Sequence, residues 1–332
     1  RPPRPAEQSE LNSLMAEAYS QAQPFVDQLG RVMAEWIPAR FSTVVPLFAE
    51  TSPQRAVHVN WDDQVELLGY DIPPVVSELD QPLMINFYWH SLTDKTFEQR
   101  LFLQLLDSKG EPINQWEGDA FREDMYRWRP DGLLTSRHAL WIGPETPADP
   151  YLIRMGFFND ATNERLPIVA LNGRAPSQPL DQVTLGLFYV SPDKTDPRLP
   201  EKSLDVNFAD TIRLNGVTLR DQISTDLLPV TLHWQVLHPT EKPLTVFLQL
   251  LNDAGEVVTS WDSQPFNGLY PTNLWSPAEL VTDTFLLPLP QGGLAAGQYR
   301  LVTGFYDFET GQRLPLVDGG DFATIDTFEV VP

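Results

Sequence analysis

The sequence lacks several features that would identify its chemistry directly. It has no cysteine, which excludes disulfides, thiolate catalysis and cysteine-ligated metal sites. Positive charge is scarce: 23 Lys and Arg face 45 Asp and Glu, for a net charge of −22. Such an acidic chain is repelled by nucleic acids and by anionic membrane surfaces, so we expect no nucleic-acid partner. The simplest consequence of the acidity is solubility.

Long apolar stretches are also missing. No run of 18 apolar residues occurs, so we expect no membrane-spanning segment in this chain. The first residue is Arg1 rather than Met, so we interpret the chain as a processed product or a fragment. An upstream signal peptide or membrane anchor could have been removed, and the sequence leaves this open.

The composition is that of a globular protein of two or three domains, with 332 residues of which 42% are hydrophobic. Its 31 prolines suit edge strands and ordered loops better than long helices.

A duplication organises the chain after residue 56. The stretch Phe-Leu-Gln-Leu-Leu occurs at 102–106 and again at 247–251, and each copy runs into a polar turn that ends in Gly-Glu. A glycine that closes such a turn between apolar segments predicts a β-hairpin. The copies lie about 145 residues apart, far beyond the ~20–50 residues of a solenoid repeat, so this is a duplicated domain.

Alternating apolar and polar residues predict half-buried antiparallel strands in both copies. On the clearest of these strands, Trp89 and its counterpart Trp234 fall on the apolar face, so we expect both to be buried. The fold class is therefore mainly β, with two tandem antiparallel sandwiches of the immunoglobulin or fibronectin-III kind. We place the first at 57–192 and the second at 203–332, joined by a short proline-rich linker at 191–200.

The N-terminal segment, 1–56, has a different pattern. Apolar residues from 7 to 37 recur at spacings of three and four, which predicts an amphipathic helix with a kink or break at Pro24. Such a stripe must be covered, either by the first sandwich or by another subunit. As the contacts of an assembly or stalk helix we name Leu11, Met15, Phe25, Leu29 and Trp36.

No catalytic signature accompanies this architecture. Nucleophile elbows, zinc-protease helices and phosphate-binding glycine loops are all absent from the sequence. None of the five histidines has metal-ligand spacing, and we expect them at the surface. The acidic loop at 318–321 lacks the ligand pattern of a calcium-binding EF-hand. We therefore expect no cofactor, no metal and no enzymatic activity.

Repeated aromatic residues are the remaining candidates for a binding site. They could be exposed platforms on which sugar rings stack, or large side chains packed in the core. The candidates in the first copy are Trp116, Tyr126 and Trp128. Their counterparts in the second copy are Trp261, Tyr270 and Trp275.

The repeat resembles the extracytoplasmic β-sandwich region at the carboxyl end of some bacterial multi-spanning glycosyltransferases, those of the protein mannosyltransferase and aminoarabinose transferase superfamily. The likeness covers about 57–332. It lies in the Val-Asn-Trp/Phe opening, the Phe-Leu-Gln-Leu-Leu hairpin, the Trp-x-Pro block and the hairpin at 155–168 and 303–316. The membrane-spanning catalytic part of that family is missing here. The resemblance implies an extracytoplasmic setting and a non-catalytic role.

Two functional hypotheses follow. The first is a structural or interaction protein at the cell surface or secreted, in which the N-terminal helix binds a protein partner or a second copy of the chain. The second is a carbohydrate-binding accessory region of a membrane glycosyltransferase, which would add glycans to the expected partners.

Overall fold

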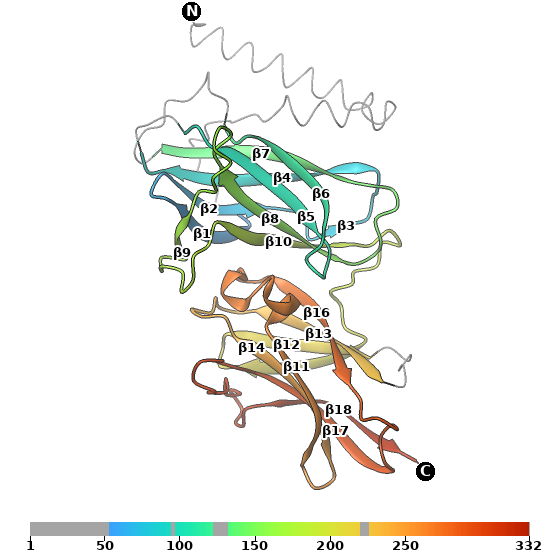
Figure 1. Cartoon of the computed structure of the whole chain (residues 1–332). Helices are drawn as coiled ribbons and strands as arrows, with labels where there is room; N and C mark the ends of the chain where they lie inside the picture. The colour runs from blue at the N-terminus through green and yellow to red at the C-terminus, as the bar shows by residue number, and fades with distance from the viewer. Residues whose placement is uncertain (1–52, 94–96, 122–131, 220–225, 332) are drawn as a thin grey trace, which may run out of the picture.

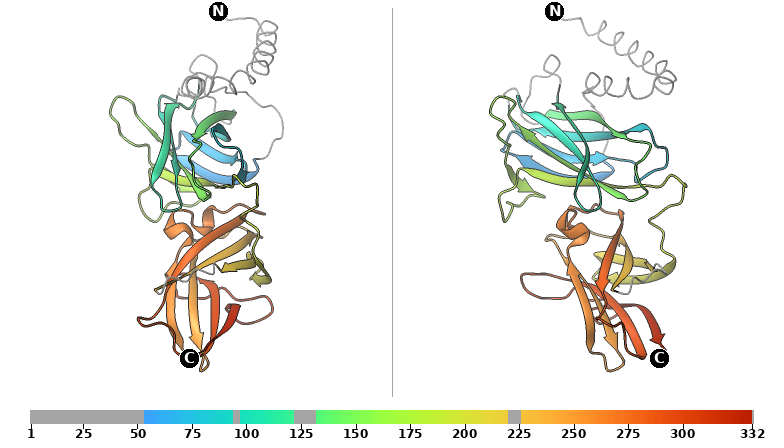
Figure 2. Two further views of the ribbon diagram at one scale, coloured as in Figure 1. Left: turned by 90° about the vertical axis from the view of Figure 1, so that its right-hand side faces the viewer. Right: turned by 45° about the vertical axis from the view of Figure 1, so that its right-hand side comes forward.

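The computed structural model of the chain describes residues 53–93, 97–121, 132–219 and 226–331. Within these ranges the protein is mainly β, with its strands in four sheets, two short 3₁₀ helices and no α-helix. Two sheets come from the first copy of the repeat and two from the second. The copies are stacked end to end, with the linker on one side (Figure 1), and Figure 2 shows the same arrangement from two other directions.

The first copy contains ten strands in two five-stranded sheets, ordered β7-β4-β2-β1-β9 and β3-β10-β8-β5-β6. Their bounds are β1 (Arg55–Trp61), β2 (Val65–Asp71), β3 (Val75–Val76), β4 (Gln81–Ser91), β5 (Arg100–Leu106), β6 (Pro112–Asp119), β7 (Gly132–Ile142), β8 (Pro150–Phe158), β9 (Ile168–Leu171) and β10 (Gln182–Val190).

The second copy has two four-stranded sheets, ordered β11-β12-β13-β16 and β15-β14-β17-β18. Its elements are β11 (Lys202–Phe208), β12 (Ile212–Leu219), β13 (Leu227–Val236), β14 (Thr245–Asn252), β15 (Val257–Ser263), η1 (Pro265–Gly268), η2 (Thr272–Leu274), β16 (Leu280–Pro288), β17 (Gly297–Tyr306) and β18 (Ala323–Val330).

The predicted alternation is confirmed on β4 and β13. Trp89 is 0% exposed and Trp234 is 1% exposed, each on the face that its strand turns to the opposite sheet. In the first copy the ring of Trp89 lies 5.6 Å from that of Phe157, and in the second copy the ring of Trp234 lies 4.6 Å from that of Phe305. The duplicated sequence thus builds two cores around the same aromatic pair.

The two predicted hairpins are also confirmed. Gly110 (φ +86°) and Gly255 (φ +78°) adopt the left-handed conformation that closes each turn, which glycine reaches without steric cost. Asp107 and Asn252 open the two turns, and the side-chain Oδ1 of each accepts a hydrogen bond from the backbone N–H four residues later, at 2.8 and 2.9 Å. The turn therefore satisfies its own polar groups in both copies.

A glycine shifts the pairing register of β2 and of β12. These residues are Gly69 and Gly216, and a Cβ at either would stand within 2.4 Å of the backbone oxygen of Arg55 or Lys202 on the adjacent strand. Only glycine allows the strands to approach this closely. In the first copy the close approach fixes the start of β1, where Arg55 lies.

Several expectations need adjustment. β3 pairs with β10 in parallel, whereas we predicted only antiparallel pairing. β1 begins two residues before the expected boundary at 57, and β11 begins one residue before 203. The expected helix over 7–37 and its assembly residues Leu11, Met15, Phe25, Leu29 and Trp36 lie outside the described residues. Within the described ranges, no helix has the length and apolar character needed to cross a membrane.

The linker at 191–200 is organised by its own side chains. Ser191 Oγ donates to Asp193 Oδ1 (2.8 Å), and Thr195 N donates to the same oxygen (3.0 Å). Arg198 forms an ion pair with Asp196 at 2.7 Å. These bonds order the linker locally and bring it to the second copy.

Candidate functional site

The two copies meet at a buried polar contact, which we call the joint. Its centre is an ion pair between Arg55, the first residue of β1, and Glu279, which immediately precedes β16; the distance from Nη1 to Oε1 is 3.1 Å. Both residues are buried. Arg55 Nη1 also donates to the carbonyl of Leu187 at 2.7 Å. A buried ion pair offsets the cost of burying its charges, and so can fix the orientation of the two copies, only when further hydrogen bonds are made to both groups, as they are here.

Two tyrosines complete the centre of the joint. Tyr270 of the second copy donates to Glu279, with its hydroxyl 3.0 Å from both carboxylate oxygens. Tyr70 of the first copy lies 3.5 Å from the Tyr270 hydroxyl and accepts a hydrogen bond from the backbone N–H of Gly186. Burial, reinforced by the Glu279 carboxylate, raises the pKa of Tyr270 well above its ordinary value. Both hydroxyls are therefore neutral and able to donate.

The charge on Arg55 persists despite its surroundings. Burial opposes that charge, but the Glu279 carboxylate outweighs the effect, and the pKa of Arg55 is raised above its ordinary value. The joint therefore holds a charged guanidinium beside the Glu279 carboxylate, with both side chains buried.

A second set of hydrogen bonds extends the joint along β16. The hydroxyl of Tyr189, on β10, accepts a 2.6 Å hydrogen bond from the backbone N–H of Thr282 and lies 3.3 Å from its carbonyl oxygen. Asn172 Nδ2 donates to the carbonyl of Asn273 (2.7 Å). At the rim, Arg174 pairs with Glu241 at 2.7 Å, and both side chains are largely exposed.

Two of the residues predicted to contact sugars are buried at the joint. Tyr270 is 0% exposed and Trp275 is 2% exposed, so neither is a surface platform. Their segment folds over the end of the second copy and is covered by the first, and Trp275 Nε1 donates to the Tyr270 carbonyl at 3.0 Å. The alternative interpretation, core packing, is confirmed for both. Tyr126 and Trp128 lie outside the described residues.

The other predicted pair, Trp116 and Trp261, lies on edge strands β6 and β15, and the two copies differ there. Trp116 is half-buried and packs against His138, with ring centroids 4.8 Å apart. Its ring lies over Gly118, where a Cβ would stand 2.7 Å from Cζ2. The equivalent residue in the second copy is Ser263, whose Cβ denies Trp261 that position. Trp261 is 38% exposed.

A small hollow of about 130 Å³ opens beside Trp261, between β15 and β16. Asp283 lies in its wall and accepts hydrogen bonds from the backbone N–H groups of Phe266 (2.7 Å) and Thr284 (2.9 Å). Burial raises the pKa of this carboxyl to about 7, and the two hydrogen bonds oppose that shift. Its counterpart in the first copy is Ser136, according to the pairing of β7 with β4 and of β16 with β13.

Two histidines are not at the surface, contrary to our expectation. His138 and His233 are each 3% exposed. The Nε2 of His138 lies 2.9 Å from Ser136 Oγ, which accepts a 2.8 Å hydrogen bond from Trp89 Nε1. Burial lowers the pKa of His138 to about 3, so the imidazole is neutral. Since Ser136 is fully buried, this chain of hydrogen bonds belongs to the core.

Sequence reasoning missed most of the joint. Arg55, Tyr189 and Glu279 carry no motif, and the bonds they form between the copies join residues more than ninety apart in the sequence. One signal was available. The copies differ at these positions, since Lys202 and Val217 stand where the first copy has Arg55 and Tyr70.

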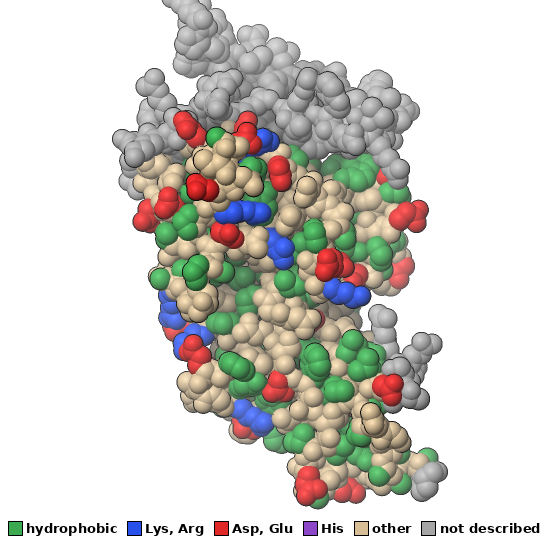
Figure 3. Space-filling view, viewed as in Figure 1, with side chains coloured by type: hydrophobic (Ala, Val, Ile, Leu, Met, Phe, Trp, Pro, Cys, Tyr) green, Lys and Arg blue, Asp and Glu red, His purple; other side chains and the backbone are tan. Residues whose placement is uncertain are grey.

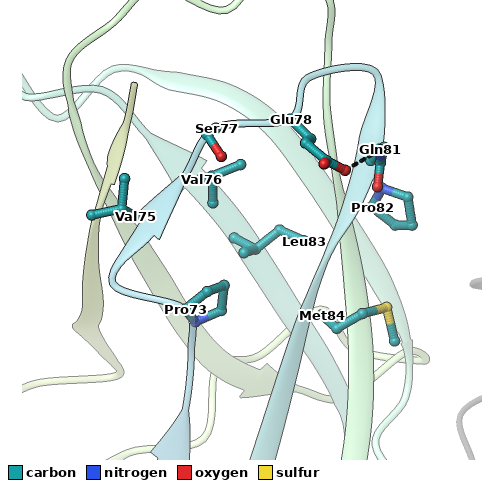
Figure 4. Close-up of a pocket in the computed structure, with 9 residues that line it drawn as sticks. All are labelled: Pro73, Val75, Val76, Ser77, Glu78, Gln81, Pro82, Leu83 and Met84. Carbon is teal, nitrogen blue, oxygen red and sulfur yellow. Dashed lines mark hydrogen bonds between the residues drawn. The ribbon is translucent and has the colours of Figure 1, made fainter. Parts of the chain in front are cut away.

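The described surface offers few other candidate sites. Within the described ranges, no group of three His, Asp or Glu side chains could hold a metal ion. An open hollow beside β3 is lined by apolar side chains and by Glu78, which accepts a hydrogen bond from Gln81 at 2.9 Å (Figure 4). On the face in Figure 3, Lys and Arg side chains lie among Asp and Glu side chains instead of forming a continuous basic surface.

No family model matches the chain, and no curated protein matches it. Among solved structures, it is similar to a glycosyl hydrolase family 2 member from Bacteroides cellulosilyticus, with a TM-score of 0.23 and 9% identity over 77% of this chain and 29% of that one. A β-glucuronidase from Bacteroides uniformis gives a TM-score of 0.23 and 10% identity over 72% and 26%. The chain spans less than a third of either enzyme, and at these scores the likeness carries no argument.

Proposed function

We propose that the chain is a non-catalytic extracytoplasmic structural or interaction protein, in which two immunoglobulin- or fibronectin-III-like sandwiches form one stiff unit. The observation that carries this proposal is the joint. A flexible tether between two independent domains would need no buried ion pair, yet Arg55 and Glu279 are both buried and each accepts or donates further hydrogen bonds. A rigid arrangement sets a fixed distance between what is bound at either end.

Distance measurements between spin labels test this stiffness. The chain has no cysteine, so Glu117→Cys on β6 and Ser260→Cys on β15 place one label on each copy at exposed positions. Double electron–electron resonance should give a single narrow distance distribution. A broad distribution in the otherwise unchanged protein would refute the rigid unit.

Two further variants locate the source of the stiffness. Arg55→Met leaves a buried carboxylate without its ion-pair partner, which costs ~3–5 kcal/mol, and should broaden the distance distribution. Arg174→Met is the matched control, because it removes an exposed pair across the same joint that is worth only ~0–1 kcal/mol. Equal distributions in both variants would show that the ion pair does not hold the copies together.

The extracytoplasmic setting and the assembly role rest on the sequence. We propose that the stripe from Leu11 to Trp36 binds a protein partner or a second copy of the chain, because an uncovered apolar stripe of this length is rare on a soluble monomer. Deleting residues 1–50 should convert an assembly into monomers, so the mass measured by light scattering should fall by more than the mass of the deleted residues. A full-length protein that is already monomeric contradicts self-association. Antibody labelling of intact cells of the source organism tests the location.

A second candidate function is carbohydrate binding, as an accessory region of a membrane glycosyltransferase. Its support is the exposed ring of Trp261 at the mouth of a hollow, since sugars stack on exposed aromatic side chains. A glycan array separates the two candidates, because a purely structural protein gives no sugar signal that depends on Trp261.

A further inference from the structure

The hollow at the open edge of the second copy has the composition of a small ligand site. Trp261 forms one wall, and Asp283 and Asn267 contribute a carboxyl and an amide group. Binding sites for small molecules combine an apolar surface with a few polar groups that fix orientation. Here an aromatic face and two kinds of hydrogen-bonding group line one space.

The wall of the hollow is built around a strained turn. Phe266 and Asn267 both adopt left-handed backbone conformations, with φ of +51° and +53°, which is costly for residues other than glycine. Asp283 Oδ2 holds the turn by accepting the backbone N–H of Phe266 at 2.7 Å, and Asn267 Oδ1 lies 3.3 Å from Ser263 Oγ. Strain of this kind persists only where the surrounding structure fixes it, so the wall is preorganised.

The first copy shows that the fold does not require this hollow. There, Trp116 lies back over Gly118 and packs against His138, and Ser136 stands in place of Asp283. The second copy has instead Ser263, which keeps the tryptophan ring outward, and a carboxyl group behind it. These differences create an aromatic surface and a polar wall at the same place.

We infer that the hollow beside Trp261 binds one ring of a neutral sugar, with its apolar face on the indole and its hydroxyl groups directed to Asp283 and Asn267. The volume of about 130 Å³ has room for several water molecules, hence for the hydroxyl-bearing edge of a single ring. The buried carboxyl and the net charge of −22 disfavour acidic sugars. This inference rests on the second candidate function and is independent of the joint.

Saturation-transfer NMR on the full chain tests the inference with four probes: methyl β-glucoside, methyl β-galactoside, methyl α-mannoside and N-acetylglucosamine. A site that holds one ring should bind with a dissociation constant on the order of 1 mM. We expect transfer from at least one probe at ~10 mM, strongest at the ring C–H protons that face the indole. Absence of transfer from all four probes overturns the inference. That result leaves the rigid-unit proposal untouched, because the spin-label distances across the joint test it separately.

Matched variants assign the site. Trp261→Ala should weaken binding about tenfold, and Trp116→Ala, the counterpart in the first copy, should leave it unchanged. Asn267→Gly removes the amide but tolerates the left-handed backbone, so it should keep the fold and weaken binding several-fold. Circular dichroism checks that each variant is folded. Equal binding by Trp261→Ala and the unchanged protein would place the sugar elsewhere and refute the inference.

Discussion

Replacing His138 with phenylalanine should remove part of the sensitivity of this protein to acid. The imidazole is buried between Phe87 and Trp116, and the ring contacts and the hydrogen bond to Ser136 are all neutral. Burial therefore disfavours its protonation without an opposing charge, and the pKa falls from 6.5 to about 3. Phenylalanine is the natural replacement, because Phe285 occupies the equivalent position in the second copy.

The sign and size of the effect follow from linkage. Between pH 6.5 and about 3 the unfolded chain protonates this histidine and the folded chain does not, so stability is lost as the pH falls. At 1.36 kcal/mol per pH unit, His138 should cost ~2 kcal/mol at pH 5 relative to pH 7, and on the order of 5 kcal/mol near pH 3. The phenylalanine variant has no such loss.

Urea denaturation of both proteins at pH 7, 6 and 5 measures this difference. Any constant packing cost of the larger ring cancels when the pH values are compared. The pH-dependent contributions of the acidic residues cancel too, because both proteins share those residues. As the pH falls from 7 to 5, the free energy of unfolding of the variant should rise by ~2 kcal/mol relative to that of the unchanged protein. A pH-independent difference, or an NMR titration in which His138 protonates near pH 6.5, would refute the reasoning.

Three further predictions concern the two cores, the register shift at Gly216 and the carboxyl group at the hollow. Trp89→Ala and Trp234→Ala should each cost ~3–5 kcal/mol in chemical denaturation, and the double variant should show the sum, because the rings lie in separate cores. Gly216→Ala should cost ~1–3 kcal/mol by the same measurement, since its Cβ would stand 2.3 Å from the Lys202 carbonyl oxygen; an unchanged midpoint contradicts the close approach. Asp283 has a folded pKa of about 7 against an ordinary 3.8, so its ionisation destabilises the folded state increasingly from about pH 4 to 7. The free energy of unfolding of Asp283→Asn should therefore rise relative to that of the unchanged protein as the pH rises, by on the order of 4 kcal/mol in total. A difference that does not change with pH would count against the shifted pKa.

Period-two alternation and turn chemistry are local, and this is why the sequence predicted the strands and hairpins. Trp89, Trp234 and the turn glycines are determined by neighbours within a few residues, and both copies repeat them. Exposure is not local. The exposure of Trp261 depends on Ser263, and the burial of Tyr270 depends on the first copy of the repeat. Alternation along one strand carries no information about either.

The histidines show the same limit. His138 and His233 were expected at the surface, yet both are buried: the Nε2 of His138 lies 2.9 Å from Ser136 Oγ, and His233 lies within hydrogen-bond distance of Thr218 and the Arg198 carbonyl. The partners of His233 come from another strand and from the linker, whereas Ser136 lies on β7 with His138. A polar residue on the outward face of a strand therefore cannot be called exposed until the segments that cover that face are known.

The joint brings together two unlike surfaces, although the copies themselves are alike. Contacts of this head-to-tail kind can in principle be repeated without limit, because each added unit presents again the surface that the next one needs. The second copy lacks that surface: Lys202, Val217 and Glu329 occupy the positions of Arg55, Tyr70 and Tyr189. Lys202 instead pairs with Asp326 of its own copy at 2.7 Å. The difference between the copies makes the contact non-propagating, so a further unit placed against this face would need a different set of contacts.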